Sequence, residues 1–128
     1  MDLSSAATEF LQERHLATLT TRRPDGTAHV TPVGFTWDAA AGVLRIITDG
    51  ASRKARNAAT GGLAAVCQFD GGRWLTLEGT VRVLTGSDEV AEAERRYAER
   101  YRTPRANPTR VVLEITVTRT YGSRTLVE

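Results

Sequence analysis

Hydrophobic residues change their spacing within the first twenty positions of the chain. Over residues 3–13 they recur at intervals of three and four, which predicts an amphipathic helix whose start Asp2 or Ser4 can cap. From residue 16 the pattern becomes extended and predicts strands over residues 16–21 and 28–37, joined by a Pro- and Gly-containing turn. The chain is therefore expected to begin with a helix that packs against a β-hairpin.

The rest of the chain places further strands around two more helices. Ser52 is expected to cap a short helix that ends near Thr60, and Ser87 to cap a longer one that ends near Tyr101. Gly79 interrupts a long alternating segment and predicts a β-bulge. The remaining strands are expected over residues 43–48, 63–69, 73–85 and 110–117.

These elements predict the fold class. Six extended segments joined mostly by tight turns, with helices at three places, indicate a mainly β protein built on an antiparallel sheet that closes or nearly closes into a barrel. The 128 residues, 41% of them hydrophobic, suffice for one core, so we expect a single domain over residues 1–128. No apolar run approaches the roughly 20 residues that cross a bilayer, and we expect a cytoplasmic protein.

Charge and cysteine content exclude several classes of function. The 17 basic and 15 acidic residues are spread along the chain, without the basic stripe of a nucleic-acid-binding protein. The single cysteine, Cys67, permits neither an intrachain disulfide nor a cysteine-based metal cluster, and its apolar neighbours predict a core position. Metal-ligand spacings and nucleophile motifs are also missing, so we expect no metal and no catalytic side chain. A redox cofactor that supplies its own chemistry suits such a sequence.

Residues 48–57 carry the strongest candidate for a binding site. Ser52 begins a helix whose first turn holds Arg53, Lys54 and Arg56, three cations that oppose the helix dipole, and a bound anion would reverse this penalty. Backbone N–H groups, the Ser52 hydroxyl and the cationic side chains together predict a phosphate site. The chain holds sixteen arginines and only this one lysine. The alternative is a solvated basic helix face, and the spacing excludes a P-loop.

Two other segments offer candidate binding residues. His29 lies in mid-strand shortly before Pro32 and Gly34, where a flat ligand could approach the backbone. The alternative for this residue is an exposed or hydrogen-bonded strand histidine. Arg102 and Arg105 stand in a Pro-restricted loop and could receive carboxylates of a substrate or of a cofactor tail, although an ordinary surface loop explains them equally well.

Several motifs together resemble one known family. The matching runs are residues 14–21, 24–26, 29–35, 52–57, 70–79 and 101–105, of which the last two are the most specific. With the N-terminal helix, they resemble the split β-barrel flavin and deazaflavin oxidoreductases related to pyridoxamine 5′-phosphate oxidase. The similarity extends over nearly the whole chain. Within that superfamily the chain is similar to the actinobacterial branch that uses coenzyme F-420, an 8-hydroxy-5-deazaflavin.

The resemblance implies a fold, a cofactor and a partner. The fold would be a six-stranded antiparallel split β-barrel, and the protein would be a homodimer whose two cofactor sites are shared between subunits. The residues implied to bind coenzyme F-420 from one subunit are His29, Val30, Thr31, Pro32, Ile47, Thr48, Asp49, Gly50, Ala51, Ser52, Arg53, Lys54 and Asn57. Those implied from the opposite subunit are Asp70, Gly71, Gly72, Arg73, Trp74, Leu75 and Thr76. Arg53 and Arg56 stand where the usual motif has neutral or apolar residues.

The resemblance also implies an activity. Reduced coenzyme F-420 would deliver a hydride to a conjugated substrate, of which biliverdin is the candidate, and Arg102 or Arg105 would hold its propionates. Two alternatives stay open: an FMN-binding oxidase like pyridoxamine 5′-phosphate oxidase, and a carrier that binds coenzyme F-420 or FMN without turnover.

Overall fold

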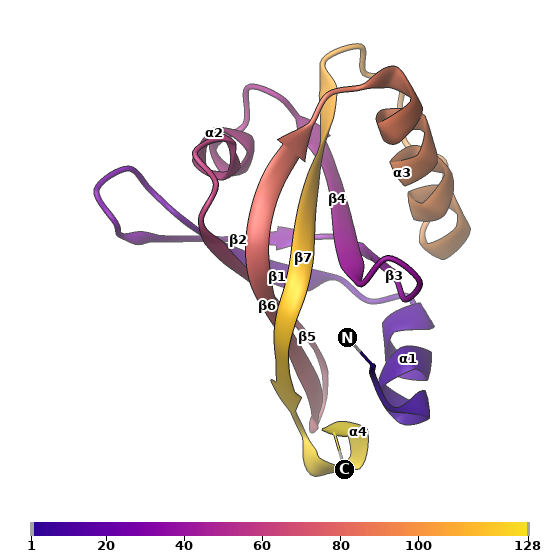
Figure 1. Ribbon diagram of the computed structural model, residues 1–128. Coiled ribbons are helices and arrows are strands. Elements are labelled where there is room, and N and C mark those ends of the chain that lie inside the picture. Colours follow the sequence, from indigo (N-terminus) through magenta and orange to yellow (C-terminus); the bar gives the residue numbers. More distant parts are fainter. Residues whose placement is uncertain (1, 128) are drawn as a thin grey trace.

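The computed structural model describes residues 2–127 as a mainly β protein, with four helices around one antiparallel sheet (Figure 1). The strands follow one another across the sheet in the order β2-β1-β5-β6-β7-β4-β3. The helices are α1 (Ser5–Gln12), α2 (Arg53–Ala59), α3 (Ser87–Arg100) and α4 (Arg124–Val127). The strands are β1 (Ala17–Arg22), β2 (Ala28–Val33), β3 (Thr36–Asp38), β4 (Val43–Asp49), β5 (Leu63–Asp70), β6 (Arg73–Leu84) and β7 (Arg110–Gly122).

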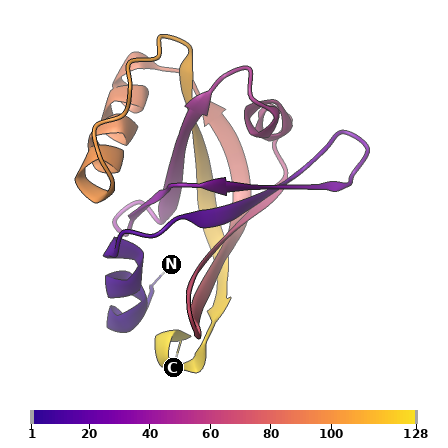
Figure 2. The same ribbon diagram turned by 180° about the vertical axis from the view of Figure 1, so that it is seen from behind.

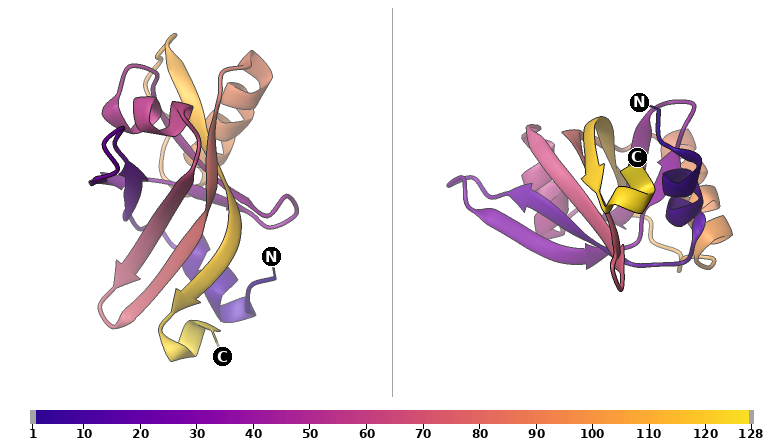
Figure 3. Two further views of the ribbon diagram at one scale, coloured as in Figure 1. Left: turned by 60° about the vertical axis from the view of Figure 1, so that its left-hand side comes forward. Right: turned by 90° about the horizontal axis from the view of Figure 1, so that it is seen from below.

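The sheet curls without closing, in agreement with the expected split barrel. The β1–β2 hairpin runs across the molecule and projects from it, whereas β4, β6 and β7 stand nearly perpendicular to it (Figure 1). Seen from below, the hairpin extends to one side, and α1 and α3 lie on the other (Figure 3). The two edge strands, β2 and β3, do not pair with each other.

The expected strand over residues 28–37 is broken into β2 and β3, which raises the number of strands from six to seven. The break falls at Gly34 and Phe35. A Cβ atom on Gly34 would lie 3.1 Å from ring atoms of both Tyr97 and Tyr101, so glycine allows these rings to approach. The Phe35 N–H donates to the Tyr101 hydroxyl at 3.2 Å. The rings of Tyr97 on α3 and of Tyr101 directly after it therefore pack against one side of Gly34.

The expected bulge at Gly79 is confirmed. The register between β6 and β7 shifts between Glu78 and Gly79, and Thr118 is the extra residue on β7. A side chain at position 79 would collide with the carbonyl oxygen of Thr116. Glycine therefore lets the two strands come close at the point where the register changes.

Two of the expected helix caps are confirmed and one is wrong. The Ser4 hydroxyl accepts a hydrogen bond from a backbone N–H in the first turn of α1, and the Ser52 hydroxyl does the same for α2. The cap of α3 is Gly86, whose backbone is extended and which offers no side chain for bonding. Ser87 is the first helical residue, and a hydroxyl caps a helix from the residue before it.

The C-terminal part of the chain is more ordered than expected. Strand β7 continues to Gly122 instead of ending at residue 117, and α4 follows it. This helix lies beside α1 (Figure 1), where the Ser4 hydroxyl donates to the carbonyl oxygen of Leu126 at 2.5 Å. Leu126 is buried and closes the lower end of the core. The sequence pattern did not predict residues 118–122 as strand, because the bulge at Thr118 interrupts the alternation of apolar and polar residues.

The core lies on the inner side of the curled sheet, beneath α1 and α2. Along β5, Ala64, Val66 and Gln68 face this core, so Cys67 points to the outer face and is partly exposed. The expected core position of Cys67 is therefore wrong, because neighbouring residues in a strand face opposite sides. Within residues 2–127, no helix is long and apolar enough to cross a membrane.

Candidate functional site

A cavity of about 450 Å³ opens between the end of β2, the second half of β4 and the segment that connects α3 to β7. This segment, residues 101–109, runs back along α3 to the start of β7 (Figure 2). Helix α2 contributes Lys54 to the lining, and α3 contributes Tyr97. The volume lies in the range of small-molecule sites. We call this space the main cavity.

The main cavity brings together expected site residues from four parts of the chain. Those that line it are Pro32, Ile47, Thr48, Asp49, Lys54, Arg102 and Arg105. Gly34, where the sequence suggested a close approach, also lines the cavity, and the lining residues that the sequence did not identify are Val33, Ile46, Tyr97, Thr103, Pro104, Asn107 and Arg110. Of these, Arg110 could have been identified, because its positive charge at the start of β7 lies directly opposite the negative charge of Asp49 at the end of β4.

The predicted phosphate segment borders the main cavity. The Ser52 hydroxyl lies 3.1 Å from that of Thr48 and accepts from the Ala55 N–H, so it is held between β4 and α2. Arg53 is exposed and Lys54 is half-buried. Within residues 2–127, neither cation forms an ion pair with a carboxylate. Both therefore remain available to an anionic ligand.

Asp49 links the end of β4 to the segment before β7 through hydrogen bonds. Its carboxylate accepts hydrogen bonds from the Ala51 N–H at 2.9 Å, from the Thr109 hydroxyl and from the Asn107 amide at 3.4 Å. The bond from Thr109 is the main reason that the pKa of Asp49 lies below its ordinary value. A Cβ atom on Gly50 would lie 3.2 Å from the Thr109 carbonyl oxygen. Asp49 therefore stays ionised, and its hydrogen bonds hold this part of the cavity wall together.

Two expected cofactor residues lie outside the cavity lining, where α2 packs on the β1–β2 hairpin. The Asn57 amide donates to the Thr21 hydroxyl at 3.1 Å, and His29 pairs with Thr21 across the hairpin. His29 Nδ1 and Asn57 Oδ1 are both buried and have no hydrogen-bond partner within residues 2–127. Burial lowers the pKa of His29, and the further causes are the positive charges of Arg23, Lys54 and Arg53.

The other residues expected around the ring face different ways along β2. Val30 is exposed on the outer side of the hairpin, whereas Thr31 is half-buried on the inner side. Pro32 is exposed and reaches the main cavity. Since β2 is an edge strand, a proline here costs no ladder hydrogen bond to a further neighbour.

A half-buried arginine, Arg100, joins the end of α3 to the α1–β1 connection, to the break between β2 and β3 and to β5, and the sequence did not reveal it. The Arg100 guanidinium donates to the carbonyl oxygens of Glu13 (2.7 Å) and Phe35 (2.5 Å) and to the Gln68 side chain (2.6 Å). Burial lowers the pKa of Arg100. The next residue, Tyr101, donates its hydroxyl to the His15 carbonyl oxygen at 2.6 Å. We call these four contacts the Arg100 hub.

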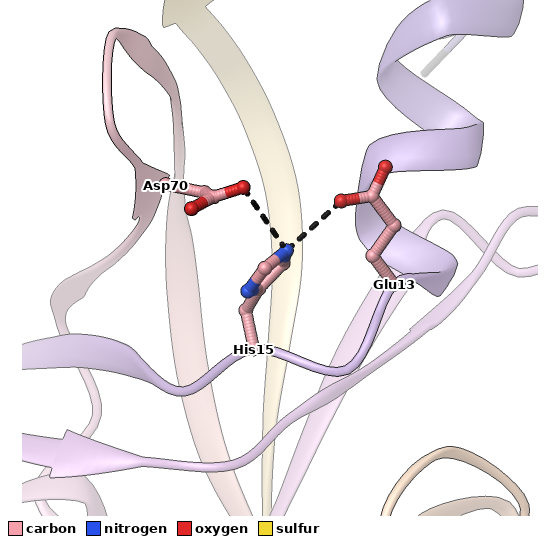
Figure 4. Close-up of side chains that lie close together, drawn as sticks. All are labelled: Glu13, His15 and Asp70. Atoms are coloured by element: carbon pink, nitrogen blue, oxygen red, sulfur yellow. Dashed lines mark hydrogen bonds and ion pairs between the residues drawn. The ribbon is translucent and has the colours of Figure 1, made fainter.

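The residues expected from the opposite subunit, 70–76, lie away from the main cavity, around the β5–β6 turn. Arg73 donates to Glu13 at 2.9 Å and to Asp70 at 2.6 Å. Figure 4 shows His15 between the same two carboxylates, and the three groups lie within 4.8 Å of one another. The spacing resembles a metal site, yet the guanidinium already occupies both carboxylates. Sequence spacing did not reveal the cluster because Asp70 reaches it only through the fold.

The same segment places aromatic side chains on the outer face of the sheet. Trp74 is 38% exposed and meets the ring of Tyr121 edge-on, with ring centroids 6.0 Å apart. Phe69, opposite Trp74 in the ladder, is 59% exposed. Leu75 belongs to the core, so only its neighbours on β6 present side chains outward. We call Phe69, Trp74 and Tyr121 the outer aromatic patch.

Comparisons with known proteins agree with this architecture. The sequence profile of the pyridoxamine 5′-phosphate oxidase family matches residues 3–124. A biliverdin reductase of Mycobacterium tuberculosis that depends on reduced coenzyme F-420 is 53% identical over 126 residues, covering 98% of this chain and 92% of that protein. A solved F-420 reductase structure is 25% identical and has a TM-score of 0.72, covering 92% of this chain and 98% of that one. A conserved hypothetical protein of M. tuberculosis has a TM-score of 0.80 at 22% identity, covering 95% and 85% of the two chains. The chain therefore belongs to the pyridoxamine 5′-phosphate oxidase family.

Proposed function

We propose that the protein is a reductase that uses reduced coenzyme F-420, and that the main cavity is its active site. One observation carries the proposal: the cavity joins Lys54 to Arg102 and Arg105 beside the apolar side chains of Pro32 and Ile47. A ligand with a flat ring and several negative charges fits such a lining. The 53% identical relative is a reductase that depends on this coenzyme.

The charges of the cavity fit an anionic cofactor. Arg102 and Arg105 are exposed, and within residues 2–127 no carboxylate pairs with either. Arg110 is neutralised by Glu94 at 2.6 Å, and Asp49 contributes one negative charge to the lining. With Lys54, Arg102 and Arg105, the positive charges that lack an ion-pair partner outnumber this negative one. The buried His29 Nδ1 near Lys54 adds an unpartnered polar atom on the α2 side of the site.

Each group of residues has a distinct task in this proposal. Lys54 and Arg53 would hold the phosphate together with Ser52, and Pro32 and Ile47 would orient the ring and exclude water from it. When bound, the reduced coenzyme would supply a hydride to an electron-poor carbon of a conjugated substrate, and a proton from solvent or from an arginine-bound water would complete the reduction. No side chain needs to act as a nucleophile.

Biliverdin is the substrate that we infer. Its conjugated system contains an electron-poor methine carbon, and its two propionates are carboxylates that unpaired arginines can bind in a bidentate manner. We infer that Arg102 or Arg105, which both line the main cavity, holds a propionate there. The relative with 53% identity is named for this substrate.

We further infer a homodimer that forms through the outer aromatic patch. Phe69, Trp74 and Tyr121 are adjacent, and side chains of this size are rarely left exposed together on a monomer. The same surface carries the outward residues of segment 70–76, which would complete the partner's site. Trp74→Glu should therefore convert a dimer to a monomer in sedimentation experiments and also weaken cofactor binding. A wild type that sediments as a monomer would contradict the dimer and leave the reductase proposal unchanged.

We also infer a cytoplasmic location, because the free thiol of Cys67 suits a reducing compartment.

Quenching of coenzyme F-420 fluorescence tests the cofactor assignment directly. Wild-type protein should bind the coenzyme, and Lys54→Met should weaken binding by about tenfold, as expected for a charge-assisted phosphate contact. Arg56→Met is the matched control, because Arg56 lies on the same helix but does not line the cavity. Equal affinities for the two variants would show that Lys54 makes no phosphate contact.

FMN is the second candidate cofactor, because its phosphate could use the same Arg53 and Lys54 cations. Protein that is yellow as purified and does not quench added coenzyme F-420 would favour an FMN-dependent oxidase. Protein that binds reduced coenzyme F-420 but does not consume it with biliverdin or other conjugated acceptors would favour a carrier. Consumption of the reduced coenzyme on adding biliverdin would exclude both alternatives.

A further inference from the structure

A second cavity, of about 330 Å³, adjoins the main cavity on the side of the α1–β1 connection. It is lined by residues 14–16, by Tyr97 of α3, and by Tyr101 and Arg102, which follow α3. Tyr97 and Arg102 line both cavities, so these two side chains form the wall between them. We call this second space the side cavity.

The side cavity is basic. Arg14 is exposed, and within residues 2–127 neither it nor Arg102 pairs with a carboxylate. The nearest acid along the chain, Glu13, is occupied by His15 at 2.9 Å and by Arg73 at 2.9 Å. The two arginines therefore face the side cavity as uncompensated cations, in the same way that Arg105 faces the main cavity.

The side cavity also has an apolar wall. Leu16 is 62% exposed there, and the rings of Tyr97 and Tyr101 lie with their centroids 4.9 Å apart. Tyr101 is held in place because its hydroxyl donates to the His15 carbonyl oxygen at 2.6 Å. A rigid aromatic wall beside unpaired arginines suits one end of a flat, conjugated molecule that carries a carboxylate.

The main cavity alone offers little room for such a substrate once a ring cofactor lies in it. A linear tetrapyrrole is itself of the size that fills a small-molecule site of several hundred Å³. Because Tyr97 and Arg102 line both cavities, a substrate that reached from the cofactor ring in the main cavity into the side cavity would run along these two side chains.

We propose that the side cavity is a second substrate subsite, in which Arg14 binds one carboxylate of an extended dicarboxylate substrate while Arg105 binds the other in the main cavity. Tyr97 and Arg102 contact the body of the substrate between them. The inference rests on the proposed function, since it takes the bound molecule to be a conjugated tetrapyrrole with two propionates.

Absorbance titration with biliverdin measures this subsite without turnover. Arg14→Gln should raise the Kd for biliverdin by about tenfold and the KM by a similar factor, whereas kcat changes by less than about twofold. For biliverdin dimethyl ester, which lacks both carboxylates, Arg14→Gln and wild type should bind equally. The matched control is Arg95→Gln, which removes the same charge from the surface of α3 outside both cavities.

The outcomes separate this inference from the proposed function. If Arg14→Gln binds biliverdin as tightly as the wild type, or loses as much affinity for the ester as for the acid, the subsite is refuted and the reductase assignment is unaffected. If the protein binds coenzyme F-420 but not biliverdin, the subsite is refuted and the cofactor assignment stands. If biliverdin binds with the expected dependence on Arg14 but coenzyme F-420 does not bind, the subsite stands and the reductase assignment fails.

Discussion

Replacing Arg100 with Met should cost more stability than any other change to a charged residue of α3. The substitution keeps an aliphatic stem but removes the guanidinium from three acceptors: the carbonyl oxygen of Glu13, the side-chain oxygen of Gln68, and the carbonyl oxygen of Phe35, which keeps only a 3.3 Å contact with the Tyr101 hydroxyl. Gln68 is fully buried and Phe35 is 1% exposed, so water does not readily replace the guanidinium at these two acceptors.

The magnitude follows from these two buried acceptors. Each buried polar group that loses its partner costs about 1–3 kcal/mol, and removal of a buried charge, which itself was costly to desolvate, offsets part of the sum. We therefore expect the free energy of unfolding to fall by about 3 kcal/mol, and the melting temperature by roughly 10 °C for a chain of this size. Arg100→Lys should lose about half as much, because one ammonium can reach only some of the acceptors.

Urea unfolding followed by circular dichroism measures the effect, with all variants at the same protein concentration. The midpoint should shift while the slope with urea stays constant, since the folded state buries the same surface. Arg95→Met on the exposed side of α3 is the control and should change stability by less than about 1 kcal/mol. A loss for Arg100→Met no larger than that of the control would refute the account of the Arg100 hub.

Three further predictions follow from other parts of the structure. Hydrogen bonds from Arg73 lower the pKa of Glu13 to about 2, and a lowered pKa stabilises the folded state at pH values above the ordinary pKa of 4.5. The difference in unfolding free energy between wild type and Glu13→Gln should therefore shrink as the pH falls from 4.5 towards 2. A difference that stays constant in acid unfolding curves would contradict this prediction. The pKa of His29, which burial and nearby cations hold low, should rise in Lys54→Met and also in wild type when inorganic phosphate binds; NMR titration that shows no response to either change would place the anion site elsewhere. Gly34→Ala should destabilise the protein by about 1–2 kcal/mol, because the added methyl group must displace two packed tyrosine rings, and unchanged urea unfolding would mean that the rings move freely.

The features that sequence predicted well are local ones. The Ser52 cap, the end of the strand before it and the cations after it lie within residues 48–57, and local geometry alone brings Thr48 and Lys54 to one cavity. The bulge at Gly79 was predictable for the same reason, because a glycine inside an alternating pattern marks it. Such features depend on neighbours along the chain rather than on the final packing.

The features that sequence missed depend on long-range packing. The Arg100 hub joins residues separated by up to 87 positions, and its acceptors are mostly backbone carbonyls, which leave no trace in the sequence pattern. Cys67 was misplaced because an apolar run does not show which residues of a strand face inward. In β5 the inward-facing positions include Gln68, a polar residue that faces the core because it forms hydrogen bonds with the Phe10 carbonyl oxygen and with Arg100.

The extra residue at Thr118 determines which side chains the end of β7 shows to the outside. Before it, Val117 points to the core; after it, the phase of the strand is reversed, so Arg119 and Tyr121 face outward beside Glu78 and Thr76. If Thr118 instead took a regular place in the ladder, the alternation would continue unbroken from Val117, the ring of Tyr121 would point inward, and the outer aromatic patch would lose one of its members. The bulge thus determines which side chains this end of β7 presents on the outer face. Straightening it with all residues kept would exchange the inward and outward side chains after Val117, whereas the residues that line the main cavity lie before it.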